Sequence, residues 1–187
     1  MRIIAGKHKN RVIPTLKNSD YRPSTAKFRE ALFSILSSGE FADVRLIHGA
    51  QVLDLFAGTG SLSFEALSRG ASSITLVDNC REHLDLAMEF ARKIGELDNI
   101  SVLVTDATSL SKAPRKYNLV FMDPPYHNKF IIKSLICLVK NDWLINGAII
   151  AVEMNKRENI ELIDGVSLMK EKVYGNNKLL VLKYDQK

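Results

Sequence analysis

The chain has 187 residues, of which 46% are hydrophobic and 25% charged, and this composition excludes a disordered or low-complexity protein. The net charge is +5, and residues 1–30 alone hold eight Lys or Arg against two acidic residues, so the positive charge is local. The spacing of the two cysteines is typical neither of metal ligands nor of a disulfide framework. The chain has no apolar segment long enough for a signal peptide or a membrane span. We therefore expect a cytoplasmic protein without a metal site.

The beginning of the chain predicts a basic β-hairpin arm followed by a helix. The first twenty residues alternate weakly between apolar and polar types around a basic, glycine-containing turn. In the helix, apolar side chains recur at i, i+4, i+7 and i+8, starting from Phe28. Ser24 or Thr25 can cap the beginning of this helix, and Gly39 can end it.

From residue 51 onward, predicted strands alternate with predicted helices, and the chain ends in a β-hairpin. Such alternation produces a mostly parallel sheet covered on both faces, with the carboxyl ends of the strands along one edge. We therefore expect an α/β, Rossmann-like domain with a seven-stranded sheet over residues 41–187, after an N-terminal unit over residues 1–40. The expected strands are 51–56, 73–78, 100–105, 117–122, 148–154, 167–174 and 178–184, and the expected helices are 61–68, 81–94 and 129–140.

A glycine-rich turn follows the first of these strands. Gly58 and Gly60 let the backbone bend sharply and approach a ligand, while N–H groups of the following helix face the same crevice. This is not the dinucleotide-binding pattern, because Ser63 occupies the position of its third glycine, and no phosphate-binding Gly-Lys-Ser/Thr follows. On its own, the glycine pair is equally compatible with a structural turn.

Acidic residues follow the next two strands. Asp78 lies about twenty residues after the glycines, where doubly wound nucleoside sites have a ribose-binding carboxylate, and Asp106 could accept a hydrogen bond from an adenine amino group. Each acid could alternatively cap a helix or a turn. Together with Asp54, they suit a nucleoside that lacks a pyrophosphate and carries a positive centre, as S-adenosylmethionine does. The candidate cofactor-binding residues are Asp54, Phe56, Ala57, Gly58, Thr59, Gly60, Asp78, Asn79, Asp106 and Ala107.

The most specific segment is Asp123-Pro124-Pro125-Tyr126, which follows the predicted strand 117–122. Two prolines cannot continue a strand inside a sheet, so a stiff extended segment would hold a carboxylate, a proline carbonyl and an aromatic ring at the strand's end. The two acceptors would bind an exocyclic NH2 group and orient its lone pair toward a methyl donor, while Tyr126 stacks on the base. We take all four residues as catalytic and predict methylation of an amino group on an unpaired or flipped-out base.

Nearly the whole chain resembles the RsmD family of methyltransferases. The resemblance is carried by Arg2-Ile3-Ile4-Ala5-Gly6, Arg22-Pro23-Ser24-Thr25, the glycine-rich segment 53–60 and the segment 123–126. It implies a class I methyltransferase fold, S-adenosylmethionine as methyl donor, and methylation of a guanine at N2 in the 16S rRNA of the small ribosomal subunit. It also implies a monomer whose basic N-terminal residues contact RNA phosphates. The implied RNA-binding residues are Arg2, Lys7, Lys9, Arg11, Arg22, Lys27 and Arg29.

Two other functions are also compatible with parts of the sequence. A DNA adenine-N6 methyltransferase uses the same four-residue motif, but this chain leaves no room for a separate DNA-reading domain. A non-catalytic RNA-binding assembly factor would not need both the cofactor acids and an intact Asp-Pro-Pro-Tyr segment. The motif itself does not choose between adenine and guanine, so that choice rests on the resemblance.

Overall fold

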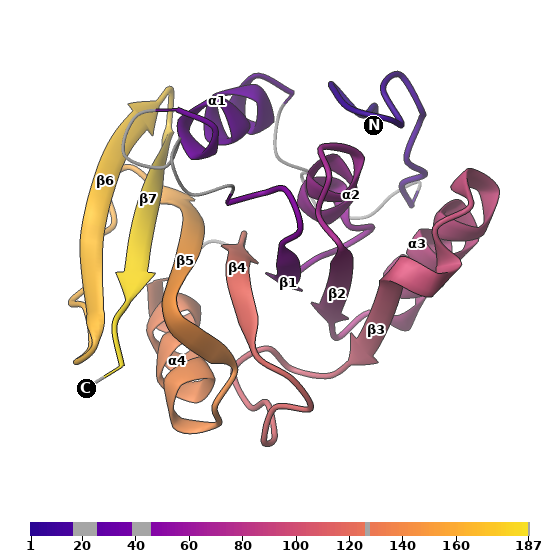
Figure 1. Cartoon of the computed structure of the whole chain (residues 1–187). Helices are drawn as coiled ribbons and strands as arrows, with labels where there is room; N and C mark the ends of the chain where they lie inside the picture. Colours follow the sequence, from indigo (N-terminus) through magenta and orange to yellow (C-terminus); the bar gives the residue numbers. More distant parts are fainter. Residues whose placement is uncertain (17–25, 39–45, 126–127, 187) are drawn as a thin grey trace.

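The computed structural model describes residues 1–16, 26–38, 46–125 and 128–186, and it shows one seven-stranded sheet with helices on both faces (Figure 1). The predicted α/β architecture is confirmed. The strands are β1 (Gln51–Leu55), β2 (Ser73–Asp78), β3 (Ile100–Val104), β4 (Tyr117–Met122), β5 (Leu144–Asn155), β6 (Val166–Tyr174) and β7 (Asn177–Tyr184). The helices are α1 (Ala26–Leu36), α2 (Ser61–Ser68), α3 (Arg81–Ile94), the short 3-10 helix η2 (Leu97–Asn99) and α4 (Asn128–Lys140).

The sheet has the strand order β3-β2-β1-β4-β5-β7-β6. Neighbouring strands from β3 to β5 are parallel, whereas β7 lies antiparallel between β5 and β6. The predicted C-terminal hairpin therefore extends the sheet beyond β5. The strand order reverses between β1 and β4, and in open α/β sheets ligands bind in the crevice outside the carboxyl ends at such a point.

Several strand boundaries differ from the prediction by one residue or more, and two of these differences have a cause in the backbone. β1 ends at Leu55 because Phe56 adopts a left-handed conformation, with a φ of 62°, that a strand does not contain. β5 begins at Leu144, before the expected residue 148, and continues through Gly147, whose φ is 80°. The pairing register with β4 shifts in this stretch, so the glycine allows an irregularity within the strand instead of ending it.

Two hydrophobic clusters pack on the two faces of the sheet. Residues of α1, α2 and α3 belong to the first cluster, in which the ring centroids of Phe33 and Phe121 lie 5.8 Å apart and those of Phe64 and Phe90 lie 4.8 Å apart. Residues of α4 belong to the second cluster, together with Met122. Successive residues of a strand thus alternate between the clusters. None of the described helices has the length and apolar character needed to traverse a lipid bilayer.

The first thirteen residues fold back on themselves and lie near α2 (Figure 1). Antiparallel pairing joins Arg2 to Val12. The side chain of Glu65, on α2, is fully buried and accepts hydrogen bonds from the backbone N–H groups of Ile4 and Ala5, at 2.7 and 3.0 Å. A buried carboxylate is tolerated only where hydrogen bonds satisfy it, so Glu65 couples the position of the arm to α2.

Candidate active site

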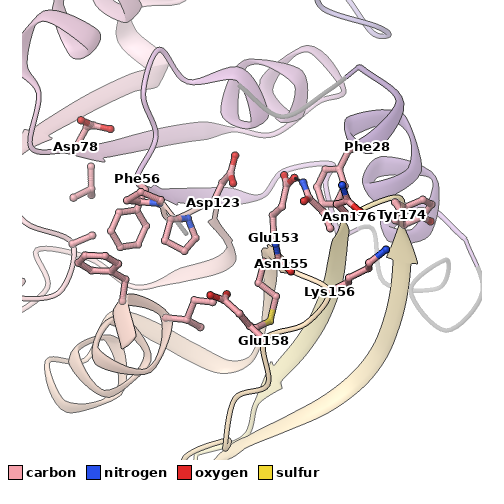
Figure 2. Close-up of a pocket in the computed structure, with 18 of the residues that line it drawn as sticks. Phe28, Phe56, Asp78, Asp123, Glu153, Asn155, Lys156, Glu158, Tyr174 and Asn176 are labelled. Atoms are coloured by element: carbon pink, nitrogen blue, oxygen red, sulfur yellow. Dashed lines mark hydrogen bonds between the residues drawn. The ribbon is translucent and has the colours of Figure 1, made fainter. Parts of the chain in front are cut away.

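A cavity of about 1180 Å³ opens at the carboxyl edge of the sheet (Figure 2). Its lining residues come from two groups of elements that are distant in the sequence. The β1–β3 half, formed by the segments that follow these strands, contains Phe56, Asp78, Asn79, Asp106 and Ala107. The β4–β7 half is formed by the segment after β4, the carboxyl end of β5, the β6–β7 hairpin and the start of α1. It contains Asp123, Pro124, Pro125, Glu153, Asn155, Tyr174, Asn176, Asn177, Lys27 and Phe28. One cavity therefore joins the two sites that the sequence predicted separately.

The turn after β1 has an unusual backbone conformation. Phe56, Gly58 and Gly60 have positive φ angles of 62°, 54° and 78°. A left-handed conformation costs a non-glycine residue on the order of 1–3 kcal/mol, and such strain concentrates at functional sites. Phe56 lines the cavity, and its ring packs edge-on against Phe130, with the centroids 6.1 Å apart.

The glycine turn shapes the backbone beneath the cavity. A β-carbon added at Gly60 would lie 2.9 Å from the Leu76 side chain and 3.1 Å from Phe64, so the core under the turn requires glycine. The hydroxyl of Thr59 is buried and has no hydrogen-bond partner among the described residues. Four predicted cofactor-binding residues of this turn do not line the cavity wall: Ala57, Gly58, Thr59 and Gly60.

Asp78 connects the glycine turn to the end of β2. Its carboxylate accepts hydrogen bonds from the backbone N–H groups of Gly58, at 2.7 Å, and Cys80, at 2.8 Å. The imidazole Nδ1 of His83 lies 3.6 Å from the same carboxylate. These contacts fix the carboxylate at the cavity wall, and because each oxygen can accept two hydrogen bonds, it can also bind a hydroxyl group of a ligand.

The other two predicted acids have different surroundings. Asp54 does not line the cavity, because its side chain is 2% exposed and accepts a 2.8 Å hydrogen bond from the hydroxyl of Ser63. Burial raises the pKa of Asp54 to about 7, against the hydrogen bonds from Ser63 and with a smaller contribution from the charge of Asp78. Asp106 is exposed at the rim and bonds the N–H and hydroxyl groups of Thr108, so it forms a turn while remaining accessible to a ligand.

The segment after β4 leaves the sheet at the predicted position. Asp123, Pro124 and Pro125 follow the last residue of β4, and all three line the cavity. In Figure 2, Asp123 lies between Phe56 of the β1–β3 half and Glu153 of the β4–β7 half. The carboxylate that the sequence assigned to the target base is thus central in the cavity.

The sequence analysis did not identify the contribution of β5 and the β6–β7 turn. Glu153 is 7% exposed, and its carboxylate accepts a 2.6 Å hydrogen bond from the side-chain amide of Asn177. The rings of Phe28 and Tyr174, which also line this half, pack edge-on with their centroids 6.0 Å apart. One signal could have indicated this region, because Glu153 is an acid in the otherwise apolar C-terminal part of its strand.

Of the predicted RNA-binding residues that the structure describes on the arm, Lys7 alone forms an ion pair with the main domain. Its Nζ lies 2.6 Å from Oε1 of Glu96, which also bonds His8. Burial alone would raise the pKa of Glu96, but hydrogen bonds from Lys7, Asn99 and His8 outweigh it and keep the pKa below its ordinary value. Four further predicted RNA-binding residues are exposed and form no ion pair with another residue that the structure describes: Arg2, Lys9, Arg11 and Lys27.

Arg29 differs from the prediction because its side chain is buried. It is 2% exposed, and its guanidinium group donates to the carbonyl oxygen of Arg2, at 2.9 Å, and to the sulfur of Met1. These contacts tie α1 to the arm, so Arg29 holds the arm and is not presented to an RNA phosphate at the surface. Six positions that the sequence singled out lie outside the described residues: Arg22, Pro23, Ser24, Thr25, Gly39 and Tyr126.

Known proteins similar to this chain cover nearly its whole length. The family described as Conserved hypothetical protein 95 matches residues 1–183. An uncharacterized methylase of Rickettsia prowazekii, RP545, is 37% identical over 98% of both chains. Ribosomal RNA small subunit methyltransferase D of Escherichia coli K12 is 32% identical over 94% of this chain and 85% of its own. The solved structure of yhhF from Escherichia coli has a TM-score of 0.87 and 31% identity, and covers 100% of this chain and 99% of its own. The chain therefore belongs to the RsmD family of methyltransferases and has the Rossmann-like fold of its structural neighbours.

Proposed function

We propose that this protein transfers a methyl group from S-adenosylmethionine to the exocyclic N2 amino group of a guanine in 16S rRNA of the small ribosomal subunit. One observation carries the proposal: a single cavity contains Asp78, at the end of β2, and the Asp123-Pro124-Pro125 segment, after β4. A donor nucleoside in the β1–β3 half and a target base in the β4–β7 half would meet inside this cavity, as group transfer between them requires.

The β1–β3 half suits S-adenosylmethionine. The Asp78 carboxylate would accept hydrogen bonds from the ribose hydroxyl groups, and the exposed Asp106 would accept one from the adenine amino group. Negative charge on Asp78 and Asp123 favours a ligand with a positive centre. When bound, S-adenosylmethionine would supply an electrophilic methyl group, whose bond to sulfur breaks as the bond to nitrogen forms, so that S-adenosylhomocysteine leaves.

Asp123 and Pro124 would orient the target amino group. The carboxylate and the proline carbonyl can each accept one N–H, which turns the nitrogen lone pair toward the donor half of the cavity. No strong base is needed, because the amino nitrogen becomes acidic as its new bond forms and can release its proton late. Positioning of this kind can contribute roughly 7–11 kcal/mol to lowering the barrier. Tyr126 would stack on the base and keep it in this orientation.

The choice of RNA as substrate rests on the relatives and on the charge of the arm. The relative from Escherichia coli is named a small-subunit ribosomal RNA methyltransferase. Arg2, Lys9 and Arg11 are exposed on an arm that Glu65 anchors, and they would bind RNA phosphates. Because one chain provides both halves of the cavity, we take a monomer as the active unit.

Methylation of defined nucleic acids tests the proposal. Purified protein is incubated with methyl-labelled S-adenosylmethionine and with small ribosomal subunits from cells that lack this protein, naked 16S rRNA, or duplex DNA. We expect labelled N2-methylguanosine in the subunits, identified by mass spectrometry and placed by primer extension. Labelled N6-methyladenine in the DNA would instead establish a DNA methyltransferase, and RNA binding without any methyl transfer would establish an assembly factor.

A further inference from the structure

An acid beside Asp123 bears on the choice between guanine and adenine. We propose that the Glu153 carboxylate accepts a hydrogen bond from the ring N1–H of the target guanine, while Asp123 and Pro124 bind the adjacent N2 amino group. This role rests on the function proposed above and adds a specificity-determining residue to the β4–β7 half of the cavity.

Glu153 and Asp123 both line the cavity, at the carboxyl ends of the neighbouring strands β5 and β4. β4 and β5 are parallel, and their register pairs Met122, the last residue of β4, with Val152, so Glu153 follows at the level where the chain leaves β4 at Asp123. Ala151 packs in the first cluster, and the side chain two positions later in β5, that of Glu153, returns to the same face. Figure 2 shows both acids at the cavity, close to the start of α1. Both carboxylates therefore border the part of the cavity that the target base would occupy.

Asn177 orients the Glu153 carboxylate from the other side. β5 lies between β4 and β7, and Asn177, the first residue of β7, donates its side-chain amide to Oε1 of Glu153 at 2.6 Å. The side chain of Glu153 is 7% exposed, and a carboxylate this buried requires hydrogen-bond donors. A carboxylate has about four acceptor positions, so one that bonds Asn177 can also accept a hydrogen bond from a base.

Guanine and adenine differ in the ring atom beside their amino group. In guanine the N2 amino group lies beside N1–H, which is a donor, whereas in adenine the N6 amino group lies beside N1, which is an acceptor. Enzymes read an unstacked base through hydrogen bonds to this edge. An acceptor at Glu153 would complete the hydrogen bonding of guanine but would face a lone pair in adenine. Sites built to bind an N–H reject analogues that lack it by about 10⁴–10⁵-fold, because a buried polar group is left unpaired.

2-Aminopurine separates the contact with N1 from the contact with the amino group. It keeps the 2-amino group of guanine, but its N1 is an acceptor. Small subunits are reconstituted with 16S rRNA that carries guanosine or 2-aminopurine riboside at the methylated position, and kcat/KM is measured for both. In the variant Glu153→Gln, Asn177 would hold the glutamine carbonyl oxygen, so the amide NH2 would face the base as a donor.

The wild-type protein should prefer guanosine to 2-aminopurine by at least about 100-fold. Glu153→Gln should lower kcat/KM for guanosine by about 100-fold and shift the preference toward 2-aminopurine by about 10-fold or more. The control Glu171→Gln removes an acid of β6 that does not line the cavity, and both values should stay within about twofold of wild type. Unchanged affinity for S-adenosylmethionine would show that the β1–β3 half is intact in both variants.

The outcomes separate this role from the function on which it rests. If the wild-type protein methylates both substrates equally, or Glu153→Gln keeps the wild-type preference, Glu153 does not read N1 and the proposed function stands. A loss of activity that is equal for the two substrates would make Glu153 a structural residue and also overturn the role. If the wild-type protein methylates neither substrate, the proposed function itself is overturned. Equal methylation of the two substrates by the wild-type protein would overturn the role even if Glu153→Gln does not fold. A wild-type preference for guanosine supports the role only together with the shifted preference of the variant, because 2-aminopurine also lacks the O6 of guanine.

Discussion

The two halves of the cavity hold their acids in different ways. In the β1–β3 half, the donors are backbone N–H groups of turns: Asp78 accepts from Gly58 and Cys80, and Asp106 accepts from Thr108. In the β4–β7 half, Glu153 accepts from the side-chain amide of Asn177, on a neighbouring strand. The first half is therefore organised by backbone donors in turns, and the second by a side chain that strand pairing supplies.

This difference suggests a division of labour in the proposed reaction. Backbone donors within a turn fix a carboxylate with little dependence on other side chains, which suits a donor nucleoside that is the same in every reaction of this class. Partners supplied by β5 and β7 can be exchanged without disturbing the glycine turn, which suits the recognition of a particular base. If the division holds, substitutions in one half should affect one measurable constant and leave the other nearly unchanged.

The largest effect is expected for Asp123→Ala, in the β4–β7 half. Loss of the carboxylate removes one of two acceptors that orient the target nitrogen, so kcat should fall by on the order of 10⁴-fold, about 5 kcal/mol. The affinity for S-adenosylmethionine, measured by titration calorimetry, should stay within about threefold of wild type, because Asp78 is not touched. A loss of both constants would mean that Asp123 supports the structure of the whole cavity and that the halves are not separable.

The same contrast explains which features the sequence could predict. Hydrophobic periodicity and the turn formed by Gly58 and Gly60 are local patterns, so the fold and the Asp78 site follow from short segments. The sequence did not predict the roles of Glu153 and Asn177, because their hydrogen bond forms only when β7 pairs between β5 and β6. Arg29 was expected to bind RNA because the resemblance implies it for the basic N-terminal residues, whereas its burial depends on where the arm docks.

The second effect concerns Asp54, which lies beneath the β1–β3 half. Its pKa is about 7 in the folded protein, against an ordinary value of 3.8, so the folded state retains a proton that the unfolded state has lost between these values. The free energy of unfolding should therefore fall as the pH rises from about 4 to about 7, by as much as about 4 kcal/mol from this group. Urea unfolding of wild type and Asp54→Asn across this pH range measures the contribution of Asp54 to the free energy of unfolding, since asparagine does not titrate. A difference between the two proteins that does not vary with pH would exclude a buried, protonated Asp54.

The third effect is expected for Asp78→Ala, in the β1–β3 half. The variant loses the proposed ribose contact and the acceptor for the Gly58 N–H group, so the affinity for S-adenosylmethionine should fall by about 10–100-fold, roughly 1.4–2.8 kcal/mol. With saturating donor, kcat should fall much less than in Asp123→Ala. An unchanged dissociation constant would refute the ribose contact. Asp106→Ala should weaken binding less than Asp78→Ala, because Asp106 is exposed to water at the rim.

The smallest effect is expected on the arm, which lies outside both halves. Removing Lys9 and Arg11 together should weaken RNA binding about tenfold at low salt, roughly 1.4 kcal/mol, because two phosphate contacts are lost. The slope of log K against log salt should become shallower by about 1.5. Both constants of the cavity, the affinity for S-adenosylmethionine and kcat at saturating RNA, should remain near wild type, since neither residue lines it.

A second double variant, in which two exposed basic residues outside the arm are replaced, controls for the loss of net charge. Lys112 and Arg115 are exposed in the loop between β3 and β4, which leads to the amino end of β4, opposite the cavity. Their double replacement by alanine removes the same charge, so a general electrostatic attraction would lower RNA affinity equally in both variants. If the slope of log K against log salt changes only in the variant of Lys9 and Arg11, the arm contacts the RNA phosphates. If the slope is the same in the two double variants, the arm does not contact RNA, and Glu65 anchors it for structural reasons alone.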